Sequence, residues 1–83
     1  MLEVKVLGPG CARCKKLFEE TQKALAETGL MASLTKVEKM PEIMAYGVMM
    51  TPALVVGGEV KCAGRIPPVP EIARWLRDAA DEV

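Results

Sequence analysis

The sequence predicts an α/β fold built around one mixed, four-stranded sheet, and three local patterns support that prediction. Residues 2–7 alternate between apolar and charged side chains, which is typical of a strand, and a Gly-Pro-Gly turn follows at 8–10. From residue 11 to residue 28 the apolar residues recur at three- and four-residue steps, which indicates a helix. Gly57-Gly58 lies between two apolar runs and predicts a tight hairpin.

In the first half of the chain we expect a strand, a helix, a second strand and a short helix. Residues 30–37 form the second strand, which completes a right-handed βαβ unit. The short helix has Pro41 near its first turn and Gly47 at its end, and its expected buried residues are Ile43 and Met44.

The second half of the chain adds two strands and a last helix. The strands over 53–56 and 59–63 are antiparallel because the glycine pair joins them directly. The last helix starts at Pro70, and the residues expected on its buried face are Ile72, Trp75, Leu76, Ala79 and Ala80. Helices then cover both faces of the sheet. A chain of 83 residues has room for one domain, so we expect residues 1–83 to form a single domain.

Charge and hydropathy argue against two classes of function. The chain has 11 basic and 11 acidic residues without a basic stripe, so no nucleic-acid partner is expected. No apolar run approaches the length of a membrane span, and residues 1–7 lack the pattern of a signal peptide. The expected compartment is therefore the cytoplasm, where thiols are kept reduced, and no membrane partner is expected.

The three cysteines carry the chemical information, because the chain has no histidine. A Cys–His nucleophile of the protease type is therefore excluded. Cys11 and Cys14 have C-x-x-C spacing at the start of the predicted first helix, where unpaired amides and the helix dipole favour a thiolate. At positions i and i+3 the two residues are close enough for a disulfide. We predict Cys11 as the exposed nucleophile and Cys14 as the partly buried resolving thiol.

The C-x-x-C pair has two other interpretations, a buried pair of small residues and half of a zinc site. A closed zinc site needs four ligands, and three cysteines without histidine do not supply them, so no metal is expected. Among the neighbouring cations, Lys15 and Lys16 are interpreted as solvated surface charges. For Arg13, a surface position and a role in stabilising the Cys11 thiolate stay equally open.

Two segments and the closing helix resemble the small thioredoxin-like, glutaredoxin-like redox-active disulfide proteins of bacteria and archaea. The segments are GPGCARC, at 8–14, and YGVMMTPALVVGGE, at 46–59. The resemblance extends over nearly the whole chain, and it implies a minimal thioredoxin fold, β-α-β-α-β-β-α. It also implies a thiol–disulfide oxidoreductase that acts on protein disulfides, takes electrons from a dithiol reductase, works as a monomer and needs no cofactor.

The resemblance also implies roles for Thr51 and Pro52. Pro52 is expected to be cis and to lie beside the dithiol, and the backbone of Thr51 is expected to pair with a bound substrate strand. The alternative is an ordinary trans proline that opens an edge strand. The Trp before the dithiol and the buried acid beneath it, which larger thioredoxins carry, have no recognisable counterpart here. The aromatic C-P-[YF]-C motif of glutaredoxins is also absent, so glutathione is not a secure substrate.

Three further residues have both a packing and a functional interpretation. Cys62, which we expect to share a strand face with Val60, is interpreted as a buried core residue rather than a third redox or metal thiol. Arg65 either contacts a substrate carboxylate or the thiolate, or is a solvated loop charge. Tyr46 is expected to pack on the first helix rather than to supply a hydroxyl to the site.

Met49 and Met50 immediately precede the Thr-Pro pair. They form an adaptable apolar rim around the dithiol for a partner protein, or one of them fills the core.

A function of a different class is also considered, that of a soft-metal or metalloid carrier. Thiolates prefer soft ions, so Cu(I) or As(III) held by Cys11, Cys14 and Cys62 is the alternative to disulfide exchange. The closing helix and the Thr-Pro pair count against a copper-chaperone pattern.

Overall fold

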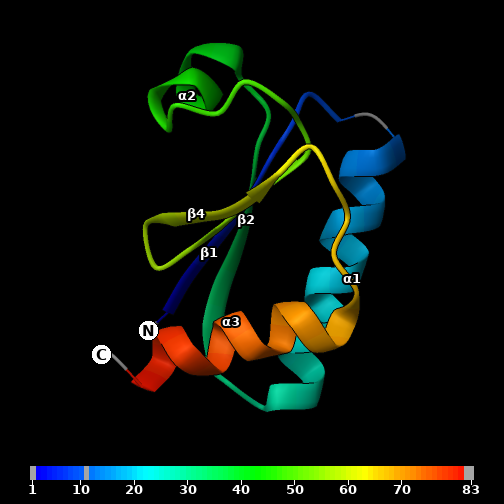
Figure 1. Ribbon diagram of the computed structural model, residues 1–83, viewed down its shortest axis with the longest axis vertical. Helices are drawn as coiled ribbons and strands as arrows, with labels where there is room; N and C mark the ends of the chain where they lie inside the picture. The colour runs from blue at the N-terminus through cyan, green and yellow to red at the C-terminus, as the bar shows by residue number, and fades with distance from the viewer. Residues whose placement is uncertain (1, 11, 82–83) are drawn as a thin grey trace.

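The computed structural model describes residues 2–10 and 12–81, so the predicted nucleophile Cys11 lies outside the described residues. The helices and strands follow the expected order (Figure 1). Their bounds are β1 Leu2–Leu7, α1 Ala12–Thr28, β2 Ala32–Val37, α2 Met40–Ala45, β3 Ala53–Val56, β4 Glu59–Ala63 and α3 Val69–Asp81. The largest departure from the expected bounds is β2, which begins at Ala32 rather than at residue 30.

The strands form one mixed sheet in the order β2-β1-β3-β4. β1 and β2 are parallel, β3 is antiparallel to β1, and the glycine hairpin makes β4 antiparallel to β3. Both central hairpin residues have a positive φ, 60° at Gly57 and 83° at Gly58, which explains why two glycines join these strands. The expected four-stranded mixed sheet and minimal thioredoxin fold are confirmed.

The carboxyl ends of β1 and β2 lie side by side, and this edge of the sheet positions the candidate site. The last residues of the two strands, Leu7 and Val37, are paired, and the Gly8 N–H donates to the Val37 carbonyl at 2.9 Å. α1 and α2 both begin at this end of the sheet (Figure 1). A residue that directly follows β2 is therefore a spatial neighbour of the turn that leads into α1.

The main hydrophobic core lies between one face of the sheet and the helices α1 and α3. Its buried residues are Leu2, Val4, Val6, Leu17, Ala24, Leu54, Val56, Cys62, Ile72, Ala73 and Leu76. Thr21 is also fully buried on α1, and its hydroxyl donates to the Leu17 carbonyl at 2.8 Å, so the polar group is satisfied. On α3 the expected burial of Ile72 and Leu76 is confirmed, while Trp75 is only half-buried.

A second, smaller core lies on the opposite face of the sheet under α2. It contains the buried residues Leu7, Ile43, Ala53 and Val55, with Val37, Tyr46, Val48 and Val60 packed against them. The prediction for Met44 was wrong, because this side chain is 65% exposed while Ile43 is 1% exposed. A six-residue helix that lies on a sheet turns only a narrow stripe inward, and Ile43 occupies it.

An irregularity in the β3–β4 pairing overturns the expected common face of Val60 and Cys62. The register shifts between Leu54 and Val55, so that Leu54 pairs with Cys62 while Val55 pairs with Val60. The extra residue, Lys61, breaks the period-two alternation. Cys62 therefore packs in the main core and Val60 in the second core.

Candidate dithiol site

Cys14 lies near the start of α1 and turns its side chain onto the end of β1. The Cys14 side chain is 5% exposed, so its expected burial is confirmed. A Cβ atom built on Gly8 would overlap the Cys14 Sγ, so the sulfur occupies the space that a side chain at position 8 would fill. Gly8 does not have a left-handed backbone, so space rather than backbone conformation requires glycine here.

The Thr51–Pro52 pair lies near the same glycine. The Thr51–Pro52 peptide bond is cis, as expected. The Thr51 Cβ lies 3.8 Å from the position that a Gly8 Cβ would take, so Thr51 and Cys14 both lie close to Gly8. The structure thus brings together three of the four predicted site residues, Cys14, Thr51 and Pro52, and the fourth, Cys11, is outside the described residues.

The loop after β4 is hydrogen-bonded to both Pro52 and α1. The Pro52 carbonyl accepts a hydrogen bond from the Gly64 N–H at 2.8 Å, and the Gly64 carbonyl accepts one from the Arg13 guanidinium at 3.0 Å. Arg13 was interpreted either as a surface residue or as a residue that stabilises the Cys11 thiolate. Its described contact is a structural one, because it connects α1 to this loop. Met50 packs over Gly64, and both Met50 and Met49 are largely exposed, so neither fills the core.

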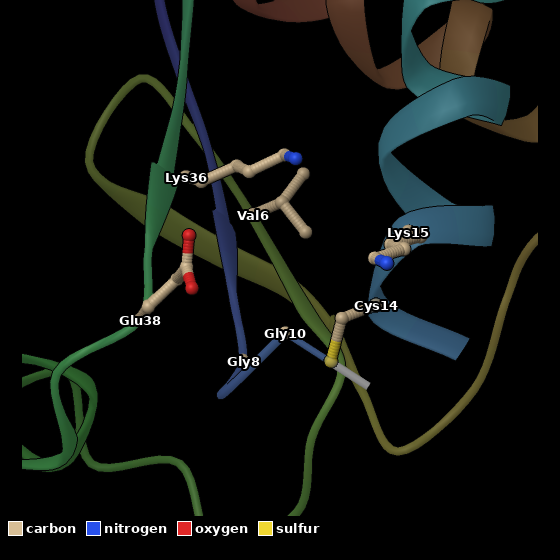
Figure 2. A pocket seen from close by; sticks show the side chains of 7 residues that line it. All are labelled: Val6, Gly8, Gly10, Cys14, Lys15, Lys36 and Glu38. Atoms are coloured by element: carbon tan, nitrogen blue, oxygen red, sulfur yellow. The ribbon is translucent and has the colours of Figure 1, made fainter. Parts of the chain in front are cut away.

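A small pocket of about 100 Å³ adjoins Cys14 on the side of β2. Figure 2 shows the side chains around it, which come from β1, α1 and the end of β2. The lining residues are Val6, Gly8, Gly10, Cys14, Lys15, Lys36 and Glu38. A carboxylate oxygen of Glu38 lies 3.2 Å from the position that a Gly10 Cβ would take, so this acid lies against the turn that leads to α1.

Glu38 is the site residue that the sequence analysis did not identify. It carries no motif, and it is the first residue after β2. The signal that finds it is topological: residues that follow two parallel, paired strands lie at one edge of the sheet, which makes Glu38 a neighbour of Gly8. Lys15, interpreted from sequence as a surface charge, is exposed but also lines this pocket.

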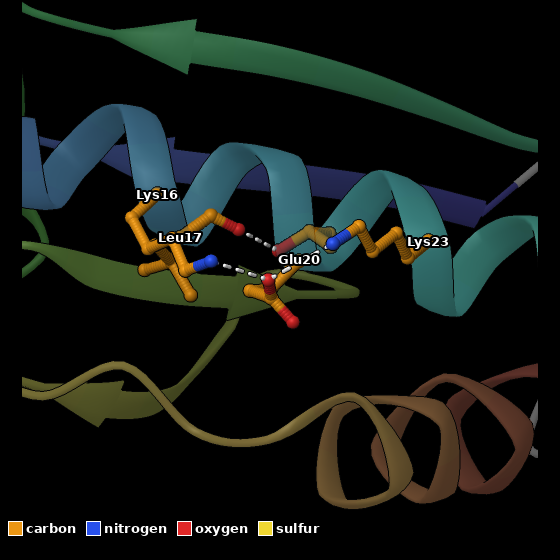
Figure 3. Close-up of polar contacts among 5 residues, drawn as sticks. Lys16, Leu17, Glu20 and Lys23 are labelled. Carbon is orange, nitrogen blue, oxygen red and sulfur yellow. Dashed lines mark hydrogen bonds and ion pairs between the residues drawn. The ribbon is translucent and has the colours of Figure 1, made fainter.

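Other charges on α1 belong to the surface of the helix. Lys16 and Lys23 both pair with the Glu20 carboxylate, at 3.1 and 3.4 Å (Figure 3). The hydrogen bond from Lys16 is the main cause that lowers the pKa of Glu20 below its usual value. The interpretation of Lys16 as a surface charge is therefore confirmed.

Arg65 and Tyr46 each form a side-chain contact within the fold. The Arg65 guanidinium pairs with both carboxylate oxygens of Glu71, at 2.6 and 3.2 Å, and lies 5.8 Å from the centre of the Trp75 ring. The expected packing of Tyr46 on the first helix was wrong, because its ring is part of the second core on the opposite face. Its hydroxyl accepts a hydrogen bond from Lys5 at 3.0 Å, which is the main cause that raises the pKa of Lys5.

Cys62 is a buried thiol of the main core, as expected. It is 8% exposed, and its burial raises the pKa of the thiol, although a backbone hydrogen bond with Leu54 and the charge of Arg65 partly oppose this effect. Within residues 2–10 and 12–81, no three side chains of the types His, Cys, Asp and Glu form a group that could hold a metal ion. The helices in that part of the chain are also too short or too polar to cross a membrane.

The comparison with known protein families agrees with this geometry. A family model described as a thioredoxin domain matches residues 2–77. The chain belongs to the thioredoxin family. It is 34% identical over 76 residues to a thioredoxin of Methanothermobacter thermautotrophicus, an alignment that covers 92% of this chain and 99% of the relative. It is 32% identical over 77 residues to a thioredoxin of Methanocaldococcus jannaschii, with 93% and 88% covered. Family membership supports thiol–disulfide oxidoreduction as the general class of activity.

Proposed function

We propose that this protein reduces disulfide bonds in other proteins, with Cys11 as the nucleophile and Cys14 as the resolving thiol. The observation that carries the proposal is that the buried Cys14 thiol and the residue before a cis proline, Thr51, both lie close to Gly8. Membership of the thioredoxin family supports the same class of reaction. The C-x-x-C spacing supplies the second thiol within reach of a disulfide.

The proposed reaction is a two-step thiol–disulfide exchange. The Cys11 thiolate attacks one sulfur of the substrate disulfide, a mixed disulfide forms, and the other substrate sulfur leaves as a thiolate. The Cys14 thiolate then attacks the Cys11 sulfur, which releases the second substrate thiolate and leaves a Cys11–Cys14 disulfide. Two electrons pass from the dithiol to the substrate, and a dithiol reductase restores the starting state.

The surface around Cys14 suits a protein substrate better than a small thiol. Met49 and Met50 expose 97% and 62% of their surface next to Thr51, and methionine adapts to different apolar partners. We propose that an extended segment of the substrate lies across these residues and pairs with the backbone of Thr51. We further propose that the protein acts as a monomer in the cytoplasm, where a reductase keeps its dithiol reduced.

The experiment is reduction of insulin with dithiothreitol as the electron source, followed by the turbidity of the freed chains. Cys11→Ser and Cys14→Ser should each lose catalysis, and Cys11→Ser should also fail to form a mixed disulfide. Cys62→Ala is the matched control and should keep the wild-type rate, because Cys62 lies in the core. A wild-type protein with no exchange activity that binds Cu(I) or As(III) tightly would contradict the proposal and favour the carrier function.

A further inference from the structure

We propose that Glu38 accepts the proton of Cys14 when this thiol becomes the resolving nucleophile. The inference rests on the proposed function, and it gives a role to a carboxylate for which the sequence offers no motif. A thiol attacks a disulfide only as the thiolate, so Cys14 must lose its proton before the second step of the exchange.

The pocket beside Cys14 provides the route for that proton. Cys14 is 5% exposed, and its side chain lines the pocket of about 100 Å³ between α1 and the ends of β1 and β2. A cavity of this volume has room for water between its polar groups. Proton transfer through one water molecule is an effective form of general base catalysis. Cys14 and Glu38 therefore do not need direct contact.

Glu38 is the one group among the described lining residues that is suited to accept a proton. The other charged groups that line the pocket are Lys15 of α1 and Lys36 of β2, and an ammonium group has no free electron pair. Lys36 also lies 4.7 Å from the centre of the Phe18 ring. Val6, Gly8 and Gly10 contribute no titratable side chain.

The strand pairing places Glu38 next to the turn that leads into α1. The parallel pairing of Leu7 with Val37 sets the position of Glu38, and its carboxylate lies against Gly10. The glycines at positions 8 and 10 keep this side of the pocket free of side chains, as Figure 2 shows. The Cys14 sulfur and the Glu38 carboxylate thus meet the same pocket from two sides.

The proposed step is balanced in protons and electrons. The proton of the Cys14 thiol passes through water to the Glu38 carboxylate, which becomes a neutral carboxylic acid. The Cys14 thiolate forms a bond with the Cys11 sulfur of the mixed disulfide, and the bond between Cys11 and the substrate sulfur breaks. The substrate sulfur leaves with the electron pair and takes a proton from Glu38 or from solvent, which restores the carboxylate.

Stopped-flow reaction with dithiobis(nitrobenzoate) separates the two thiols. In a Cys62→Ala background, the first release of the coloured thiolate depends on reagent concentration and reports Cys11. The second release is intramolecular and reports Cys14. The rate of the second release is measured from pH 6 to pH 9 for the Cys62→Ala parent protein and for its Glu38→Gln and Glu38→Asp variants. Glu27→Gln is the control, because Glu27 is an exposed residue on α1 away from the pocket.

For the parent protein we expect the second release to depend only weakly on pH near neutrality, because a general base removes the need for the Cys14 thiol to ionise beforehand. For Glu38→Gln we expect the second release to be slowed about tenfold at pH 6.5, which is below the usual range of general base effects because Glu38 is exposed to solvent. The slowed rate should recover as the pH rises and the thiol ionises without help. Glu38→Asp should recover part of the rate, and Glu27→Gln should match the parent.

Three other outcomes would contradict either the role of Glu38 or the proposed function. If Glu38 acts only through its negative charge, then its removal stabilises the thiolate and makes the second release faster, which would overturn the inference. Equal profiles for Glu38 and Glu38→Gln would overturn it as well, with the dithiol function intact. A parent protein that releases only one thiolate per chain would instead contradict the proposed function itself.

Discussion

Gly8 connects the sequence motif to the geometry of the site, and the requirement for glycine there can be tested. The Cys14 sulfur fills the place of a side chain at position 8, and the Thr51 Cβ lies 3.8 Å from that place. Gly8→Ala forces the sulfur or the turn to move, so we expect a loss of about 1–3 kcal/mol in the free energy of unfolding. Urea denaturation followed by circular dichroism measures this loss.

The control for Gly8→Ala is the same substitution in a Cys14→Ala background. Without the sulfur the overlap disappears, so Gly8→Ala should cost clearly less there than in the wild-type protein. The difference between the two costs is the coupling energy of the pair. Equal costs in both backgrounds would show that the overlap with Cys14 does not determine the need for glycine.

Cys62 should differ from the dithiol in its reactivity. Burial raises the pKa of its thiol, and each pKa unit lowers the thiolate fraction at neutral pH about tenfold. In a Cys11→Ser, Cys14→Ser double variant, we therefore expect iodoacetamide at pH 8 to alkylate Cys62 much more slowly in the folded protein than in urea. Intact-mass spectrometry follows the reaction. Equal rates with and without urea would contradict the description of Cys62 as a core residue.

The chemical residues differed in how far the sequence could predict them. The burial of Cys14 could be expected from the C-x-x-C spacing, whereas the cis bond at Pro52 could be expected only from the resemblance to thioredoxin-like proteins. Glu38 belongs to no motif, and its position depends on which strands are neighbours and in which direction they run. Arg65 was left open because only the docked start of α3 supplies its partner Glu71.

At the scale of the elements, an ion pair connects the start of the loop after β4 to the first turn of α3. Arg65 holds Glu71 with two contacts, and their hydrogen bond is the main cause that lowers the pKa of this carboxyl below 4.5. A lowered folded-state pKa stabilises the fold above the pKa of the unfolded chain, and the contribution is lost as the pH falls through the folded value. The side chains of Arg65 and Glu71 are 52% and 35% exposed, so solvent screens the pair and its effect on stability is small.

Glu71→Gln tests this contribution. At pH 7 we expect a slightly lower thermal unfolding midpoint than in the wild-type protein, and the gap should shrink as the pH falls below 4.5. Glu59→Gln is the control, because this side chain is 72% exposed and should show a smaller gap. A Glu71→Gln gap that widens in acid would contradict the role of the ion pair.

The elements themselves followed closely from periodicity, and the errors have a common cause. The alternation in β1 and the glycine hairpin gave the correct strands, since both signals are local. The predicted packing of Tyr46 was wrong because it depends on where α2 lies over the sheet. The predicted common face of Val60 and Cys62 was wrong because the β3–β4 register shifts. Tertiary packing determines which side of the sheet these side chains face, and no local sequence pattern predicts it.

At the scale of the whole molecule, one sheet separates two cores of unequal size. The main core contains α1, α3 and Cys62, and the second contains α2 and Tyr46. β1 and β3 contribute to both, because alternate residues of each strand face opposite sides, such as Leu54 and Val55. Loss of packing in the second core should therefore weaken the sheet that supports the first.

Ile43→Ala tests whether the two cores unfold together. Ile43 is 1% exposed in the second core, so its truncation should cost about 2–5 kcal/mol. Trp75, on α3, packs against the main core, and its fluorescence should report the same urea midpoint as circular dichroism if unfolding is cooperative. Met44→Ala, on the same helix but 65% exposed, should change stability by less than about 0.5 kcal/mol. If Ile43→Ala shifts the circular dichroism signal but leaves the Trp75 transition at the wild-type midpoint, the two cores unfold separately. The end of the sheet beside Cys14 and Glu38 would then be positioned independently of α2.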